Sequence, residues 1–185
     1  DWWDYGAGCV AALIDRLDEG PAVLVGTSGG AVVALRTAIR TPTRVRAVVA
    51  DSCVARQPPE RLEAEVAKRA HAGPEIARFW AYAHGEDWQA VIDADSALMQ
   101  RHAARDGRWF GDELSRVRCP VLFTGSIRDA TLHEGAAQMM EMAGYIPESE
   151  VSLVNGGDHP LMWTRSEAFR RLSTSFLDRL GSGAG

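Results

Sequence analysis

The residues of this sequence best suited to chemistry are a serine, a histidine and an aspartate, each of which follows an apolar segment. Ser28 stands at the centre of a Gly-x-Ser-x-Gly motif, between the apolar run 22–25 and a segment with helical periodicity. A strand that turns this sharply into a helix strains the backbone of its serine and lifts the hydroxyl above the sheet. The pattern therefore predicts a nucleophilic serine.

The outer glycines of this motif are expected to be required by the turn. A Cβ at Gly26 or Gly30 would collide with the neighbouring chain, so little beyond glycine is tolerated at either position. A chain with 18 glycines also produces the bare motif by chance, and an ordinary glycine-rich turn is the alternative. The strand before the motif, the helix after it and the partners described next favour a nucleophile.

A serine hydroxyl is a weak nucleophile near neutral pH and needs an imidazole that takes its proton. Of the five histidines, His159 lies in a glycine-flanked loop after a late apolar segment, so we expect it to be the base. A histidine in an ordinary turn is the alternative. Three of the others, His71, His84 and His102, lie in predicted helices and are interpreted as solvated or packing residues. His133 lies too close in sequence to the candidate acid to be its usual partner.

The imidazole in turn needs an acceptor on its other nitrogen, which fixes its tautomer. Asp129 follows the penultimate predicted strand, and we expect it to be this acid. Asp51 follows the predicted strand before it and is the alternative acid. Asp158 adjoins His159 and points elsewhere in most loop geometries. If neither Asp129 nor Asp51 has a catalytic role, each is expected to be a surface or helix-capping carboxylate.

Helices and strands alternate around these candidates. The unalternating run 22–25 predicts a strand buried on both faces, as in a parallel sheet. Ligands bind at the carboxyl ends of the strands of such a sheet, where all three candidates lie. The other predicted strands are 45–50, 120–124 and 151–154, and the predicted helices are 7–19, 31–41, 131–144 and a final one through 169–180.

The segment 54–118 lacks a strand pattern and exceeds what a crossover between two strands needs. Three helices are predicted in it, one from Pro59 to about His71, one from Pro74 and one that ends near Ala104. We therefore expect an inserted helical cap at 54–118, a core formed by 1–53 and 119–181, and a flexible tail at 182–185. Apolar ligand sites are rich in aromatic residues, and four of them are candidates for a substrate pocket: Trp80, Trp88, Trp109 and Phe110.

Composition and charge narrow the possible partners. The chain has 185 residues and a net charge of −5 without a basic stretch, which disfavours nucleic acid. No apolar run approaches the length of a membrane span and no signal peptide is visible, so no membrane partner is expected. Three scattered cysteines without metal-ligand spacing indicate core residues in a reducing compartment, and we expect a cytoplasmic protein.

From the serine motif to its C-terminus the sequence resembles the α/β-hydrolase superfamily. Within it, the sequence is most similar to the valacyclovir hydrolase (biphenyl hydrolase-like) group. The resemblance rests on the Gly-x-Ser-x-Gly motif, on the segments 79–99 and 114–120, and on Asp129 with His159. It implies an α/β fold with a parallel sheet flanked by helices and a helical cap. It also implies that the first strands of the fold, with a second oxyanion donor, precede Asp1 and are missing here.

The resemblance implies a serine hydrolase that cleaves a small carboxylic ester or related acyl compound without a metal or organic cofactor. Ser28, His159 and Asp129 match the catalytic triad of the family, and the N–H of Gly29 matches an oxyanion donor. The valacyclovir hydrolase group has an acidic residue at the position of Gly29, so its amino-acid-ester preference is not implied. The alternatives are a ligand-binding or scaffold protein that retains the fold, and a superfamily member that cleaves C–C bonds or uses peroxide.

Overall fold

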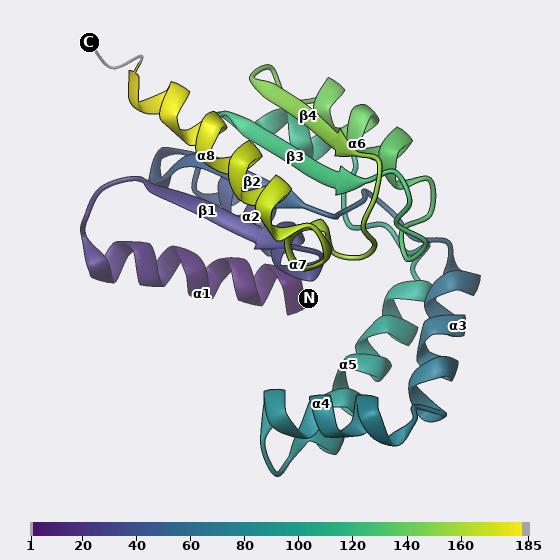
Figure 1. Ribbon diagram of the computed structural model, residues 1–185. Coiled ribbons are helices and arrows are strands. Elements are labelled where there is room, and N and C mark those ends of the chain that lie inside the picture. The colour runs from purple at the N-terminus through teal and green to yellow at the C-terminus, as the bar shows by residue number, and fades with distance from the viewer. Residues whose placement is uncertain (1, 183–185) are drawn as a thin grey trace. The chain divides into compact units, whose positions relative to one another are not determined.

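The computed structural model describes residues 2–182, which form two compact units (Figure 1). One unit combines the chain up to Ala55 with the chain from Trp109 onward, and the other comprises Arg56–Arg108. Of the tail expected at 182–185, residue 182 ends the last helix, and 183–185 lie outside the described residues. The first unit carries the sheet, and the second unit is helical.

Four parallel strands form the sheet of the first unit, in the order of the sequence. They are β1 (Ala22–Thr27), β2 (Val45–Asp51), β3 (Val121–Ser126) and β4 (Ser149–Val154). Each predicted strand is present, and each is at least one residue longer than predicted. Because neighbouring strands pair in parallel, their carboxyl ends lie along the same edge of the sheet (Figure 1).

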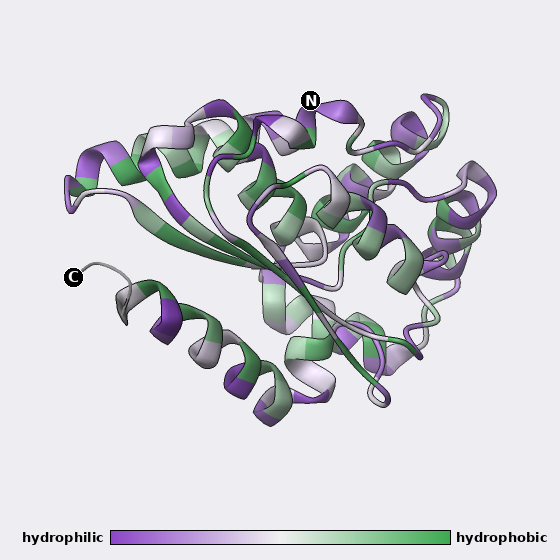
Figure 2. Ribbon diagram, turned by 90° about the horizontal axis from the view of Figure 1, so that it is seen from above, coloured by the Kyte–Doolittle hydropathy of each residue, from purple (hydrophilic) through white to green (hydrophobic). Residues whose placement is uncertain are grey.

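Helices cover both faces of this sheet. On one face, α2 (Gly29–Arg40) packs on β1 and β2, α6 (Gly135–Gly144) packs on β3 and β4, and α1 (Trp2–Leu17) packs against α2. On the other face lies α8 (Ser166–Ser182), as Figures 1 and 2 show. The core under α8 consists of four buried side chains from β2, β3 and α8: Ala47, Val49, Leu122 and Phe176. Three partly buried apolar residues of α8 pack against it: Phe169, Leu177 and Leu180.

The prediction that the strand 22–25 is buried on both faces is wrong. Val23 is 39% exposed and Val25 is 52% exposed. Among the described residues β1 forms one edge of the sheet, so it has a neighbouring strand on one side. Val23 and Val25 are in register with Ala47 and Val49, which α8 buries, but they lie one strand further out. An edge strand of this kind keeps an apolar sequence without complete burial.

Two helices begin several residues away from their predicted starts. The first helix begins at Trp2 rather than at residue 7, because Trp3 and Ala7 already lie on its buried face. The helix predicted from residue 131 begins at Gly135, because the preceding residues form a loop around the Asp129 side chain. Short helical segments that were not predicted are η1 (Pro42–Arg44), η2 (Asp112–Arg116) and α7 (Leu161–Thr164).

The helical unit contains α3 (Pro59–Ala70), α4 (Pro74–His84) and α5 (Trp88–Ala103). Both α3 and α4 pack against α5, and an ion pair between Arg69 and Asp95 joins α3 to α5. This unit ends at Arg108 rather than at residue 118. The reason is that the backbone N–H groups of Trp109 and Phe110 both donate to the carbonyl of Ala55, which belongs to the first unit.

None of the helices described in residues 2–182 has the length and hydrophobicity needed to span a bilayer.

Candidate active site

The turn between β1 and α2 places Ser28 at the edge of the sheet. Its backbone has φ 53° and ψ −122°, a left-handed conformation that a side chain rarely adopts. The first helical hydrogen bonds of α2 run from the N–H groups of Ala31 and Val32 to the carbonyl of Ser28. The serine therefore sits directly before the helix N-terminus, held in a strained turn, as the motif predicts.

The two outer glycines of the motif differ in how close their neighbours are. A Cβ built on Gly26 would lie 2.3 Å from the carbonyl oxygen of Gly30, so the turn excludes any side chain there. The same expectation is wrong for Gly30. A Cβ at Gly30 would have no atom within 4 Å, because this residue lies in the first turn of α2 and faces open space.

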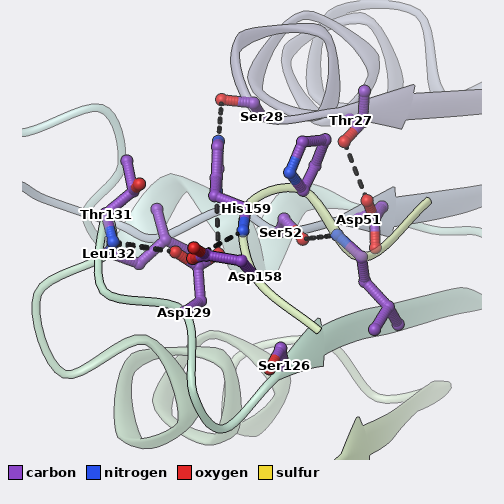
Figure 3. A network of polar contacts seen from close by, with 12 residues as sticks. Thr27, Ser28, Asp51, Ser52, Ser126, Asp129, Thr131, Leu132, Asp158 and His159 are labelled. Carbon is purple, nitrogen blue, oxygen red and sulfur yellow. Dashed lines mark hydrogen bonds and ion pairs between the residues drawn. The ribbon is translucent and has the colours of Figure 1, made fainter. Parts of the chain in front are cut away.

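The structure brings Ser28, His159 and Asp129 together in one chain of hydrogen bonds (Figure 3). The Oγ of Ser28 lies 2.9 Å from Nε2 of His159, and Nδ1 of His159 lies 2.7 Å from Oδ2 of Asp129. The Asp129 side chain is 2% exposed and the His159 side chain 16% exposed. The imidazole can therefore accept a proton on the serine side while a nearly buried carboxylate orients its other nitrogen.

The loop after β3 fixes the Asp129 carboxylate. Its Oδ1 atom accepts the backbone N–H groups of Thr131 at 2.9 Å and of Leu132 at 3.2 Å. These bonds leave Oδ2 for His159. The carboxylate is thus held in one orientation by its own loop, which is why the helix that follows begins late.

The loop after β4 is tied to the end of β3. The hydroxyl of Ser126 donates to the carbonyl of Gly157 at 3.0 Å and accepts the N–H of Arg128 at 3.0 Å. Asp158, next to the histidine, accepts the N–H of His159 at 2.9 Å, so its carboxylate binds backbone. The loops that carry the acid and the base are therefore joined through one serine hydroxyl.

The alternative acid, Asp51, lies at the end of β2 and is fully buried. Its carboxylate accepts hydrogen bonds from the hydroxyls of Thr27 and Thr124 and from the N–H of Met162. The His159 imidazole is bonded to Asp129 instead. Asp129 is thus the carboxylate that the fold presents to the imidazole.

The sequence matches the model of the Alpha/beta hydrolase family over residues 1–172. The chain belongs to the alpha/beta hydrolase family. Among solved structures it is similar to NosK from Streptomyces actuosus, with a TM-score of 0.80 and 20% identity, over 97% of this chain and 79% of NosK. It is also similar to E-2-(acetamidomethylene)succinate hydrolase, with a TM-score of 0.66 and 25% identity, over 93% and 72% of the two chains.

A third similar structure is a thermophilic esterase from Thermogutta terrifontis, determined with malate bound. Its TM-score is 0.68 at 23% identity, over 94% of this chain and 71% of the esterase. Similarities at these identities establish the fold of this α/β-hydrolase. The finer resemblance to the valacyclovir hydrolase group stays a prediction.

In this α/β-hydrolase, the N-terminus of α2 lies beside the serine. The N–H of Ser28 itself donates to the carbonyl of Asp51 at 2.9 Å. Gly29 is the first residue of α2, and the first N–H groups of a helix have no acceptor within the helix. Such a group is suited to stabilise developing negative charge. A Cβ on Gly29 would meet Nε1 of Trp3 at 3.9 Å, an ordinary contact, so the position has room for a side chain.

The four aromatic pocket candidates fall in two places. Trp80 and Trp88 belong to the helical unit and pack against each other with ring centroids 5.9 Å apart. Trp109 is buried in the first unit, edge-on to Trp3, with centroids 5.8 Å apart. Phe110 is buried beneath the guanidinium of Arg36. A role for any of the four in substrate binding stays a prediction.

Two further histidines and one cysteine have surroundings that differ from those of the candidate triad. Nδ1 of His71 lies 2.9 Å from the carbonyl of Ala67 in its own helix, and Nε2 of His133 lies 3.7 Å from Glu134. Burial, together with the charge of Asp51, raises the pKa of the Cys53 thiol. No group of three or more His, Cys, Asp or Glu side chains within residues 2–182 is arranged to hold a metal ion.

Sequence reasoning missed the hydroxyls that surround the candidate triad. These hydroxyls belong to Thr27, near the carboxyl end of β1, and to Thr124 and Ser126, near the carboxyl end of β3. Each forms a hydrogen bond with a neighbouring strand or loop. The signal was present, because each is a polar residue at the end of an apolar strand. Such positions lie next to the ligand site of a parallel sheet.

Proposed function

We propose that this protein is a serine hydrolase that cleaves a small carboxylic ester or related acyl compound through an acyl-enzyme. The observation that carries the proposal is the chain of hydrogen bonds from Ser28 Oγ through His159 to Asp129. A binding protein has no need of a proton relay of this kind, whereas a nucleophilic serine requires one.

In the first half of the reaction, Oγ of Ser28 attacks the carbonyl carbon of the ester while Nε2 of His159 takes the hydroxyl proton. The carbonyl oxygen becomes negatively charged and is stabilised by the N–H of Gly29 at the start of α2. The C–O bond to the leaving group then breaks, and the imidazolium returns the proton to the departing alcohol. Asp129 keeps its charge throughout and stabilises the imidazolium.

In the second half, a water molecule takes the place of the alcohol. His159 removes a proton from this water, which attacks the acyl carbon of the Ser28 ester. The bond between the acyl carbon and Oγ breaks, the proton returns to Oγ, and the carboxylic acid leaves. Each step uses the same imidazole, so one hydrogen-bond chain serves both halves.

Two further observations support this chemistry. The chain belongs to a hydrolase family, and one of the similar structures is an esterase. The strained backbone of Ser28 is the kind of feature that persists at functional sites because the surrounding structure holds it in place.

We also propose a cytoplasmic location, since scattered free cysteines are typical of proteins in a reducing compartment.

Labelling with a fluorophosphonate probe tests the proposal directly, because the probe reacts with activated serines. We expect one adduct, on Ser28, and hydrolysis of p-nitrophenyl acetate by the wild-type protein. Ser28→Ala is expected to abolish labelling and to lower kcat by about a million-fold, as for serine proteases. Retention of more than about a tenth of the rate, a loss of only 1.4 kcal/mol or less in transition-state stabilisation, would exclude Ser28 as the nucleophile.

A further inference from the structure

A second buried carboxylate lies beneath the candidate triad. The Asp51 side chain has no exposed surface. Its Oδ1 accepts the hydroxyl of Thr124 at 2.7 Å, and its Oδ2 accepts the hydroxyl of Thr27 at 2.8 Å and the N–H of Met162 at 3.1 Å. Burying a carboxylate is costly unless hydrogen bonds compensate it, and here all of these bonds lead to other segments of the chain.

Each donor to Asp51 belongs to a segment that carries one member of the candidate triad. Thr27 directly precedes Ser28 at the end of β1. Thr124 lies on β3, the strand that leads to Asp129. Met162 lies in α7, directly after the loop of His159. One side chain thus contacts all three segments, as Figure 3 shows for Asp51 and Thr27.

The backbone of Asp51 and the residue that follows it make hydrogen bonds to the same segments. The carbonyl of Asp51 accepts the N–H of Ser28 at 2.9 Å. The next residue, Ser52, accepts the N–H of Leu161 on its hydroxyl at 2.9 Å and donates its own N–H to the carbonyl of Thr124 at 2.8 Å. The first turn of α7 is therefore held by two adjacent residues at the end of β2.

We propose that Asp51 is a positioning residue for the hydrolytic reaction. Its carboxylate holds the serine turn, the end of β3 and the first turn of α7 in one arrangement, and so fixes the distance between Ser28 Oγ and His159 Nε2. This inference rests on the proposed function of the same site. Catalysis is sensitive to such placement, since a displacement of about 1 Å costs on the order of a hundredfold in rate.

The role requires hydrogen-bond acceptors rather than a charge next to the reacting atoms. In Asp51→Asn, the amide oxygen can take the position of Oδ2, where it accepts from Thr27 and Met162. The amide N–H₂ then faces Thr124, whose hydroxyl can rotate to accept a hydrogen bond. Asp51→Ala removes the acceptor from all three donors. The two variants therefore separate the geometry of the site from its charge.

The test compares Asp51→Ala, Asp51→Asn and Thr124→Val by steady-state ester hydrolysis. We expect Asp51→Ala to lower kcat by roughly ten- to a hundredfold with little change in KM, Asp51→Asn to restore most of kcat, and Thr124→Val to lie between them. The control is Thr37→Val, which removes a buried hydroxyl that donates to the carbonyl of Val33 in its own helix.

A second measurement does not depend on turnover. The His159 Nδ1 proton, bonded to Asp129, is expected to give a downfield NMR signal that is lost or broadened in Asp51→Ala and kept in Asp51→Asn and Thr37→Val. If the signals behave in this way while the wild-type protein hydrolyses no ester, the role of Asp51 in positioning Ser28, His159 and Asp129 stands, and the proposed ester hydrolysis fails.

Three results would overturn the inference. The first is an Asp51→Ala variant with wild-type kcat and an unchanged signal. The second is an Asp51→Asn variant as impaired as Asp51→Ala, which would indicate that the charge itself is needed. If Asp51→Ala does not fold, Thr124→Val decides, and wild-type kcat with an unchanged signal in this variant contradicts the role.

Discussion

The two oxygens of the Asp129 carboxylate are divided between the imidazole of His159 and the loop that carries the acid. Oδ2 lies 2.7 Å from Nδ1 of His159, whereas Oδ1 accepts the N–H groups of Thr131 and Leu132. The carboxylate cannot turn without losing one of these sets of bonds. The arrangement holds the proton of the neutral imidazole on Nδ1 and leaves Nε2 free to accept the proton of Ser28.

Asp129→Asn is expected to keep the fold and to lower kcat by up to about ten-thousand-fold, as the equivalent change does in serine proteases. The amide oxygen still accepts the loop N–H groups, but the amide N–H₂ then faces Nδ1 and stabilises the wrong tautomer. Hydrolysis of p-nitrophenyl acetate and thermal unfolding check both parts. Asp51→Asn is the matched variant, and the assignment of the acid is reversed if it loses more activity than Asp129→Asn.

Gly26→Ala and Gly30→Ala are expected to differ in stability although both glycines belong to one motif. The new Cβ at Gly26 would lie 2.3 Å from the carbonyl oxygen of Gly30, and overpacking of this kind costs about 1–3 kcal/mol or more. At Gly30 the Cβ meets no atom within 4 Å, so alanine is expected to be neutral or to stabilise the helix by up to about 1 kcal/mol. Chemical denaturation measures both, and equal losses of stability would contradict the expected difference.

Substrate preference follows from the absence of a charge at Gly29. We predict no strong preference for α-amino esters over their uncharged analogues. A charged hydrogen bond contributes about 1.5–3 kcal/mol, equivalent to roughly ten- to a hundredfold in kcat/KM. Competition between paired esters measures the ratio. A preference of that size for the amino ester would mean that another carboxylate binds the ammonium group.

Thiol reagents are expected to leave ester hydrolysis intact. Burial and the nearby Asp51 raise the pKa of Cys53, and burial raises the pKa of Cys119 to about 11, so both thiols stay protonated and unreactive at neutral pH. Iodoacetamide should therefore modify Cys9, which is exposed, before the other two. Mass spectrometry after brief treatment locates the adduct, and rapid inactivation with an adduct on Cys53 would disagree with this expectation.

The strands and the groups of the candidate site could be predicted because their signals are local. An apolar run before Gly-x-Ser-x-Gly is visible in a few residues, and His159 stands out by its glycine-flanked loop. Helix starts at Pro59 and Pro74 follow from proline itself, and both helices begin there. Strong local preferences of this kind agree with the fold that the whole chain adopts.

Features that depend on distant partners were not predictable. The exposure of Val25 is decided by its position at the sheet edge, and the room at Gly30 by the path of the neighbouring backbone. The contact of Asp51 with Met162 joins residues 111 positions apart in the sequence. Asp129 was the expected acid, but the alternative, Asp51, is set aside only by the assembled sheet, which defines the strand end that faces the imidazole.

The chain leaves the sheet unit after Ala55 and returns to it at Trp109, and these two residues are hydrogen-bonded to each other. The carbonyl of Ala55 accepts the N–H groups of Trp109 and Phe110. Within the helical unit, the backbones of Arg56 and Arg108 form an isolated antiparallel β-bridge. The chain ends of the insertion are therefore already side by side, and the register between β2 and β3 does not depend on how many residues separate them. A junction of this kind lets evolution exchange, lengthen or shorten the inserted segment as a module while the strands that carry the hydrogen-bond chain keep their pairing.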